Sequence, residues 1–181
     1  HSMQNSAMEI SVGHGKIQDV ENPQKLFLQI GLGALKYFIL KVDPKKRILF
    51  NPKASVDFNG NTGPFIQYAY ARIQSILRST KKIDWKPNNN IKIDIKEKEI
   101  LKHLLIYPQI VKQAGESYSP ALIANYLYDL VKLFNSFYQN ISILGEGDPN
   151  LKNFRLVLTQ KVGHTIFNSC SLLGIEVPDR M

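Results

Sequence analysis

The sequence contains a single cysteine, Cys170, among its 181 residues. One thiol cannot form a disulfide within the chain, and such sparse use of cysteine is typical of a reducing compartment. The histidines are scattered, so no group of His and Cys has the spacing of a metal site. No order of Ser, His and Asp marks a catalytic site, and His103 and His164 fit a helix surface better than catalysis. We therefore expect neither a metal site nor catalytic residues in this chain.

Long apolar runs are also missing. No stretch reaches the ~20 residues that a membrane-spanning helix needs, and no signal peptide is visible. We therefore expect a cytoplasmic protein without contact to a membrane. His1-Ser2-Met3 resembles the remnant of a purification tag, and the polar residues 1–21 are interpreted as tag remnant and flexible lead-in.

Acidic residues are few relative to basic ones. The chain has 23 Lys and Arg against 15 Asp and Glu, a formal net charge of +8 and a pI near 9.5. A basic surface favours polyanionic partners, of which nucleic acid is the commonest. Hydrophobic residues make up 44% of the sequence, which is enough for a packed core. The length suits one large domain, or one domain with part of another.

The strongest helix signal lies between Asn61 and Thr80. Asn61 or Thr62 can cap this helix, and Pro64 fits its first turn, where a missing N–H group costs nothing. Helical periodicity predicts an apolar face made of Ile66, Ala69, Ile73, Ile76 and Leu77. A neighbouring stripe combines aromatic, cationic and hydroxyl groups, namely Phe65, Tyr68, Arg72, Ser75 and Ser79. Such a stripe either binds nucleic acid or forms the packing border of an ordinary amphipathic helix.

Further helices are predicted from capping residues and apolar periodicity. One starts at Asn22-Pro23, one turn falls within 51–59, and others cover 96–106, 109–114, 119–140 and 151–173, with Gly174 just beyond the last. A short strand or extended piece is predicted at 47–50, and a short extended piece at 91–95. We therefore expect an all-α helical bundle with a short irregular or extended lead-in. Its helices 61–80, 119–140 and 151–173 should pack together, because they carry the longest apolar stripes.

The segment from Thr62 to Ile73 reads Thr-Gly-Pro-Phe-Ile-Gln-Tyr-Ala-Tyr-Ala-Arg-Ile. It closely resembles the Thr-Gly-Pro-Tyr-x-Gln-Tyr-Ala-His-Ala-Arg-Ile segment of arginyl-tRNA synthetases, with Phe65 in place of Tyr and Tyr70 in place of His. Similar blocks follow in the same order, at 33–37, at 120–138 and in the ending 173–181, so the resemblance covers roughly residues 31–181. Residues 152–155, Lys-Asn-Phe-Arg, stand at the tetrapeptide that names the DALR anticodon-binding domain, and only the arginine matches.

The resemblance implies the C-terminal part of a class I arginine–tRNA ligase. Residues 22–60 would be the end of the catalytic domain and a connecting segment, and 61–181 a DALR-type helical anticodon-binding domain. The parent enzyme would attach arginine to tRNA(Arg) with ATP and Mg²⁺ in protein synthesis. The chain lacks the His-Ile-Gly-His and Lys-Met-Ser-Lys-Ser signatures of the class, so we expect it to be inactive alone and to need no cofactor. The expected partners are tRNA(Arg) and the catalytic domain of the same chain, in a monomer.

The resemblance also implies site residues. The anticodon surface of the family maps onto Phe65, Tyr68, Tyr138 and Met181, and the chain-end carboxylate of Met181 would accept from a base amino group. Candidate phosphate-binding residues, chosen because they lie on or beside the helix 61–80 and its loops, are Lys45, Lys46, Arg72, Lys81, Lys82 and Lys86.

Two residues keep more than one interpretation. Arg155 falls within an apolar arc, so we favour a core ion pair or a bond to a backbone carbonyl over contact with RNA. Trp85 lies among lysines and either anchors its loop or stacks on a base. Two alternatives for the whole chain are a helical protein-interaction scaffold and the tRNA-binding domain of a related class I synthetase.

Overall fold

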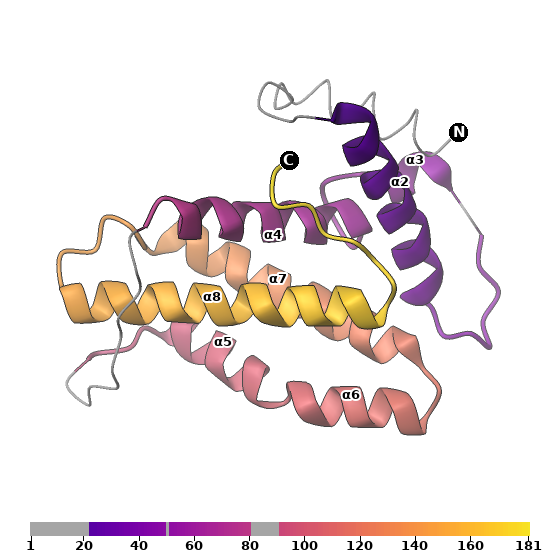
Figure 1. The fold of residues 1–181 in the computed structure, drawn as a ribbon. Helices are drawn as coiled ribbons and strands as arrows, with labels where there is room; N and C mark the ends of the chain where they lie inside the picture. The colour runs from indigo at the N-terminus through magenta and orange to yellow at the C-terminus, as the bar shows by residue number, and fades with distance from the viewer. Residues whose placement is uncertain (1–21, 50, 81–90) are drawn as a thin grey trace.

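The computed structural model describes residues 22–49, 51–80 and 91–181 (Figure 1). The predicted lead-in at 1–21 lies outside the described residues. So do Phe50 and the loop 81–90, which contains Lys81, Lys82, Trp85 and Lys86.

Helices make up the regular structure of the described residues, and no strand occurs among them. In chain order they are α2 (Pro23–Leu40), α3 (Pro52–Ser55), α4 (Gly63–Arg78), α5 (Ile95–Leu105), α6 (Tyr107–Glu116), α7 (Pro120–Asn140) and α8 (Pro149–Leu172). The predicted all-α class is therefore confirmed. None of these helices is both long and apolar enough to cross a membrane, as far as the described residues extend.

The centre of the bundle lies between α4, α7 and α8, as predicted (Figure 1). Their facing sides bury a continuous apolar cluster that includes Ile66, Ile73, Leu127, Phe134 and Ile166. Helix α5 packs against α7 and α8, α6 packs against α7, and α2 runs across the end of the bundle in contact with α4. Burial of the long apolar stripes is the main source of stability in such a bundle.

Local sequence explains where the helices begin and end. The side chains of Asn22 and Thr62 accept hydrogen bonds from backbone N–H groups in the first turns of α2 and α4, each ahead of a proline in the first turn. At the end of α8, Gly174 has a φ of +65°, and Ile175 N donates to Cys170 O over 2.8 Å. This is the left-handed turn with which a glycine commonly ends a helix.

The two predicted extended pieces differ from the structure only in part. Residues 91–94 form neither helix nor strand, and Asp94 has extended backbone angles, but Ile95 begins α5 because Asp94 and Glu97 form a capping box. Residues 47–49, the described part of the strand or extended piece expected at 47–50, form no strand.

Close backbone contact joins α2 to α4. A Cβ atom on Gly63 would lie 2.6 Å from the carbonyl oxygen of Gly33, and one on Gly33 would lie 2.4 Å from Nε2 of Gln67. Neither position therefore has room for a larger side chain. The glycines let α2 approach closely enough to bury Tyr37, whose hydroxyl lies 2.6 Å from Asn61 Oδ1 and 2.9 Å from Ala124 O.

Candidate nucleic-acid interface

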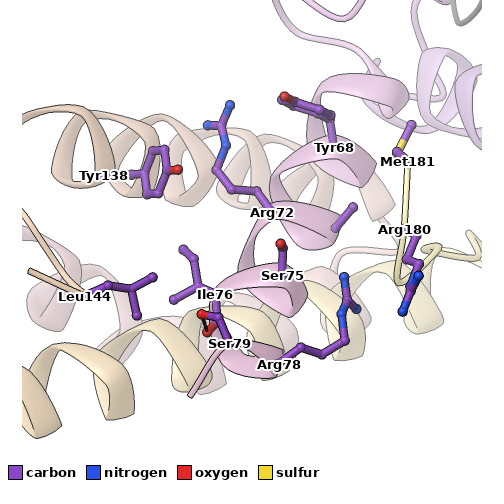
Figure 2. A pocket seen from close by; sticks show the side chains of 11 residues that line it. Tyr68, Arg72, Ser75, Ile76, Arg78, Ser79, Tyr138, Leu144, Arg180 and Met181 are labelled. Carbon is purple, nitrogen blue, oxygen red and sulfur yellow. Dashed lines mark hydrogen bonds between the residues drawn. The ribbon is translucent and has the colours of Figure 1, made fainter. Parts of the chain in front are cut away.

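A hollow of about 660 Å³ opens along one side of α4 (Figure 2). Its wall is shared by α4, the C-terminal end of α7, Leu144 of the α7–α8 loop and the chain after α8. That last segment returns along α4 as a tail of residues 173–181 (Figure 1). The lining residues are Tyr68, Ala71, Arg72, Ser75, Ile76, Arg78, Ser79, Tyr138, Leu144, Arg180 and Met181. Most of the polar stripe predicted on α4 therefore faces this hollow.

The guanidinium group of Arg72 lies between two tyrosine rings (Figure 2). Its Cζ atom is 4.8 Å from the ring centroid of Tyr68 and 4.8 Å from that of Tyr138. Nη1 also donates to Asn135 Oδ1 over 2.7 Å, which fixes the orientation of the group. Cation–π attraction at this distance holds cation and rings together. The arrangement offers flat ring faces and N–H donors at one place.

Each tyrosine ring is held by a second ring behind it. Phe58 meets Tyr68 edge to face with centroids 6.1 Å apart, and Phe134 stacks against Tyr138 at 6.3 Å. Phe134 is fully buried in the core, whereas Tyr138 remains 41% exposed. Aromatic pairs at these separations favour defined ring orientations. The two tyrosines are therefore partly exposed rings on a rigid support.

The rim of the hollow is basic. Besides Arg72, the arginines Arg78 and Arg180 line it, and both are exposed. Nη1 of Arg78 donates to the carbonyl oxygen of Asp179 over 3.0 Å. None of the side chains that line the hollow is acidic among the described residues. The local field therefore favours an anion such as a phosphate.

Met181 reaches the hollow from the tail. It is half-buried and packs against an apolar cluster formed by Leu26, Ile30, Ala34 and Val56, which belong to α2 and to the segment after α3. The tail thus contributes an apolar wall opposite the tyrosine of α7 (Figure 2).

The structure brings together Tyr68, Arg72, Tyr138 and Met181, which are four of the site residues predicted from the sequence. Phe65 does not line the hollow; its half-buried ring packs against Tyr128, with centroids 5.7 Å apart.

Lys45 and Lys46 are exposed in the turn after α2, which Figure 1 places at the far end of the bundle from the C-terminal end of α4. Arg78 and Arg180 were not predicted. Arg180 lies in an irregular tail that gives no periodic signal, although its neighbour Met181 was predicted.

Arg155 has the structural role expected of it. Its Nε atom donates to Glu97 Oε1 over 2.6 Å, and Nη1 donates to Ser142 O over 2.9 Å and to Glu146. Both predicted partners, a carboxylate and a backbone carbonyl, are therefore confirmed. The backbone N–H of Asp148 and the charge of Arg155 lower the pKa of Glu146 below its ordinary value. Arg155 fixes the α7–α8 loop to α5 and lies outside the hollow.

These features define a class: a helical domain with an aromatic and cationic hollow on its surface. In the described residues, no group of three His, Cys, Asp or Glu side chains is arranged to hold a metal ion.

Residues 66–181 match the DALR anticodon binding domain family, and the chain belongs to it. The chain is similar to the arginine–tRNA ligases of Flavobacterium psychrophilum, with 54% identity, and of Parabacteroides distasonis, with 50% identity. Both comparisons cover 99% of this chain but only 30% and 31% of those proteins, so the chain spans about a third of its curated relatives. It also resembles the Thermus thermophilus arginyl-tRNA synthetase structure with a TM-score of 0.86 and 29% identity, over 99% of this chain and 32% of that one.

Proposed function

We propose that this chain is the tRNA-binding C-terminal part of an arginine–tRNA ligase and that its hollow receives the anticodon loop of tRNA(Arg). The observation that supports this most strongly is the guanidinium of Arg72 held between the rings of Tyr68 and Tyr138. Proteins read RNA loops by splaying bases out, stacking them on aromatic side chains and bonding their edges. The hollow supplies rings for stacking and N–H donors for base edges within one concave surface.

In this proposal splayed bases stack on the exposed parts of the two tyrosine rings, and Arg72, which lies over both rings, donates hydrogen bonds to base edges. Met181 closes the apolar side of the hollow, while Arg78 and Arg180 meet phosphates at the rim. Phe65 supports Tyr128 and the α4–α7 contact and does not stack on a base itself. The lysines Lys45, Lys46, Lys81, Lys82 and Lys86 add electrostatic attraction along the RNA.

The chemistry of the parent enzyme takes place elsewhere. We propose that the catalytic domain in the rest of the parent chain binds ATP and Mg²⁺ and forms arginyl-tRNA. The piece described contributes recognition alone, as a monomer in the cytoplasm.

The test measures the affinity of an anticodon stem-loop of tRNA(Arg) together with the thermal midpoint. Tyr68→Ala and Tyr138→Ala should each weaken binding by roughly five- to a hundred-fold, because one stacked base contributes about 1–3 kcal/mol. Tyr138→Phe keeps the ring and should retain most of the affinity. Tyr118→Ala is the matched control, because Tyr118 is 88% exposed and lies outside the hollow.

A stem-loop with changed anticodon bases should bind more weakly to the wild type. Affinity should also fall as salt rises between about 50 and 200 mM, because phosphate contacts release counterions. If both alanine variants stay folded and bind like the wild type, the anticodon assignment is wrong. If no tRNA binds saturably, a helical interaction scaffold explains the chain better.

A further inference from the structure

The tail of residues 173–181 is held along its length by side chains of α2 and α4. The hydrogen bonds that hold it run from Lys36 Nζ to Gly174 O, from Gln29 Nε2 to Glu176 Oε2, from Gln67 Nε2 to Glu176 O and from Arg78 Nη1 to Asp179 O. Ile175 and Pro178 are buried beside them. The tail is therefore fixed along α4 by these contacts, and this path brings its last residues to the hollow.

Gln67 is the innermost of these donors. Its side chain is fully buried, and Nε2 donates both to Glu176 O over 2.8 Å and to Gln29 O over 3.2 Å. One amide group therefore joins the tail, α4 and α2. Gly33 leaves the space for it, because a Cβ atom there would lie 2.4 Å from Nε2.

This arrangement is costly for stability alone. Oε1 of Gln67 is buried and has no hydrogen-bond partner in the described structure. A buried polar atom without a partner destabilises the fold, and an apolar side chain of similar size at position 67 would avoid that cost. The amide is well suited, however, to setting the position of one backbone carbonyl, that of Glu176.

We propose that Gln67 is a positioning residue for the hollow: by fixing Glu176 O it places Arg180 and Met181 in the wall, without touching RNA itself. The proposal rests on the proposed function only where it concerns RNA. Because the same amide bonds to Gln29 O, and because Met181 packs on α2, the position of the wall depends on the position of α2. Helix α2 and the RNA-binding surface are thereby coupled through the tail.

The principal test is Gln67→Met, which keeps the length of the side chain and removes the donor. Amide hydrogen exchange at 175–181 should become faster. Stem-loop affinity should fall by between roughly two- and a hundred-fold, the range of couplings between residues in contact. In a background where Arg180 and Met181 are both alanine, the same substitution should cause no further loss. A purely structural role would give the same loss in both backgrounds.

The matched control is Tyr126→Phe, which loses a part-buried hydrogen bond between α7 and His103 O of α5, away from the tail. It should lower the thermal midpoint and leave both tail exchange and affinity unchanged. If Gln67→Met is unfolded at the assay temperature, the same readouts are taken on the wild type and the variant at a lower temperature at which both are folded.

The outcomes separate the two proposals. If the wild type does not bind RNA, the proposed function fails. Amide hydrogen exchange at 175–181 then still tests whether Gln67 fixes the carbonyl oxygen of Glu176. If the wild type binds RNA and Gln67→Met leaves tail exchange unchanged, or loses the same factor in both backgrounds, the positioning role is refuted.

Discussion

Replacement of Arg155 by methionine should strongly destabilise the protein. The side chain of Arg155 is 11% exposed, and that of its partner Glu97 is 0% exposed. Without the guanidinium, Glu97 keeps the backbone N–H of Asp94 but loses the cation that compensates its charge. Breaking a buried pair from one side costs about 3–5 kcal/mol. For a chain of this size that loss corresponds to a fall in the thermal midpoint of roughly 6–20 °C.

Urea denaturation followed by circular dichroism measures this loss. The double variant Glu97→Met/Arg155→Met should be more stable than Arg155→Met alone, because it leaves no unpaired carboxylate at position 97. Lys112→Met is the surface control: it breaks a 3.7 Å pair with Glu116 between side chains that are 74% and 67% exposed, and should cost at most about 1 kcal/mol. A cost no larger than that of Lys112→Met would refute this reasoning.

Three further predictions concern single positions. Gly63→Ala should destabilise the protein by about 1–3 kcal/mol or more, because its Cβ would lie 2.6 Å from Gly33 O. Gly115→Ala is the control: a Cβ there meets nothing within 4 Å, so the substitution should be neutral or stabilising by up to ~1 kcal/mol. Urea denaturation of both variants measures the difference. Burial raises the pKa of Cys170 to about 12, so a thiol reagent should label the folded protein very slowly and the urea-unfolded protein quickly. The stabilisation linked to this thiol is present below its ordinary pKa of 9.0 and is lost as the pH rises towards 12. Because the pKa of Glu146 is lowered from 4.5, its contribution is present above pH 4.5 and lost as the pH falls further; Glu146→Gln should therefore show a flatter loss of unfolding free energy on acidification than the wild type.

The long helices could be predicted because their signals are local. Thr62 and Pro64 start α4, and the glycine at 174 ends α8, where each residue acts within one turn of its own position. The end of the piece predicted at 91–95 has the same origin. Alternation of isoleucines with charged residues placed Ile95 in an extended chain, whereas the capping box of Asp94 and Glu97 makes Ile95 the first residue of α5.

The site was predictable in part. Periodicity identified the stripe on α4, and the resemblance added Tyr138 and Met181. Periodicity gives the face of a helix but not the element that covers it, so it grouped Phe65 with Tyr68 although Tyr128 packs on Phe65. The path of the tail leaves no pattern, because its bonds join single side chains to backbone carbonyls.

The contact between Gly33 and Gly63 bears on how this protein can be divided. The family match starts at residue 66, and the boundary predicted from the sequence lies at 61. A piece cut at either position loses α2, and with it Tyr37 and the apolar cluster on which Met181 rests. The hollow would then lack the support of the wall that Met181 forms. A portable module for grafting or for recombinant expression should therefore begin before Asn22, the residue that caps α2.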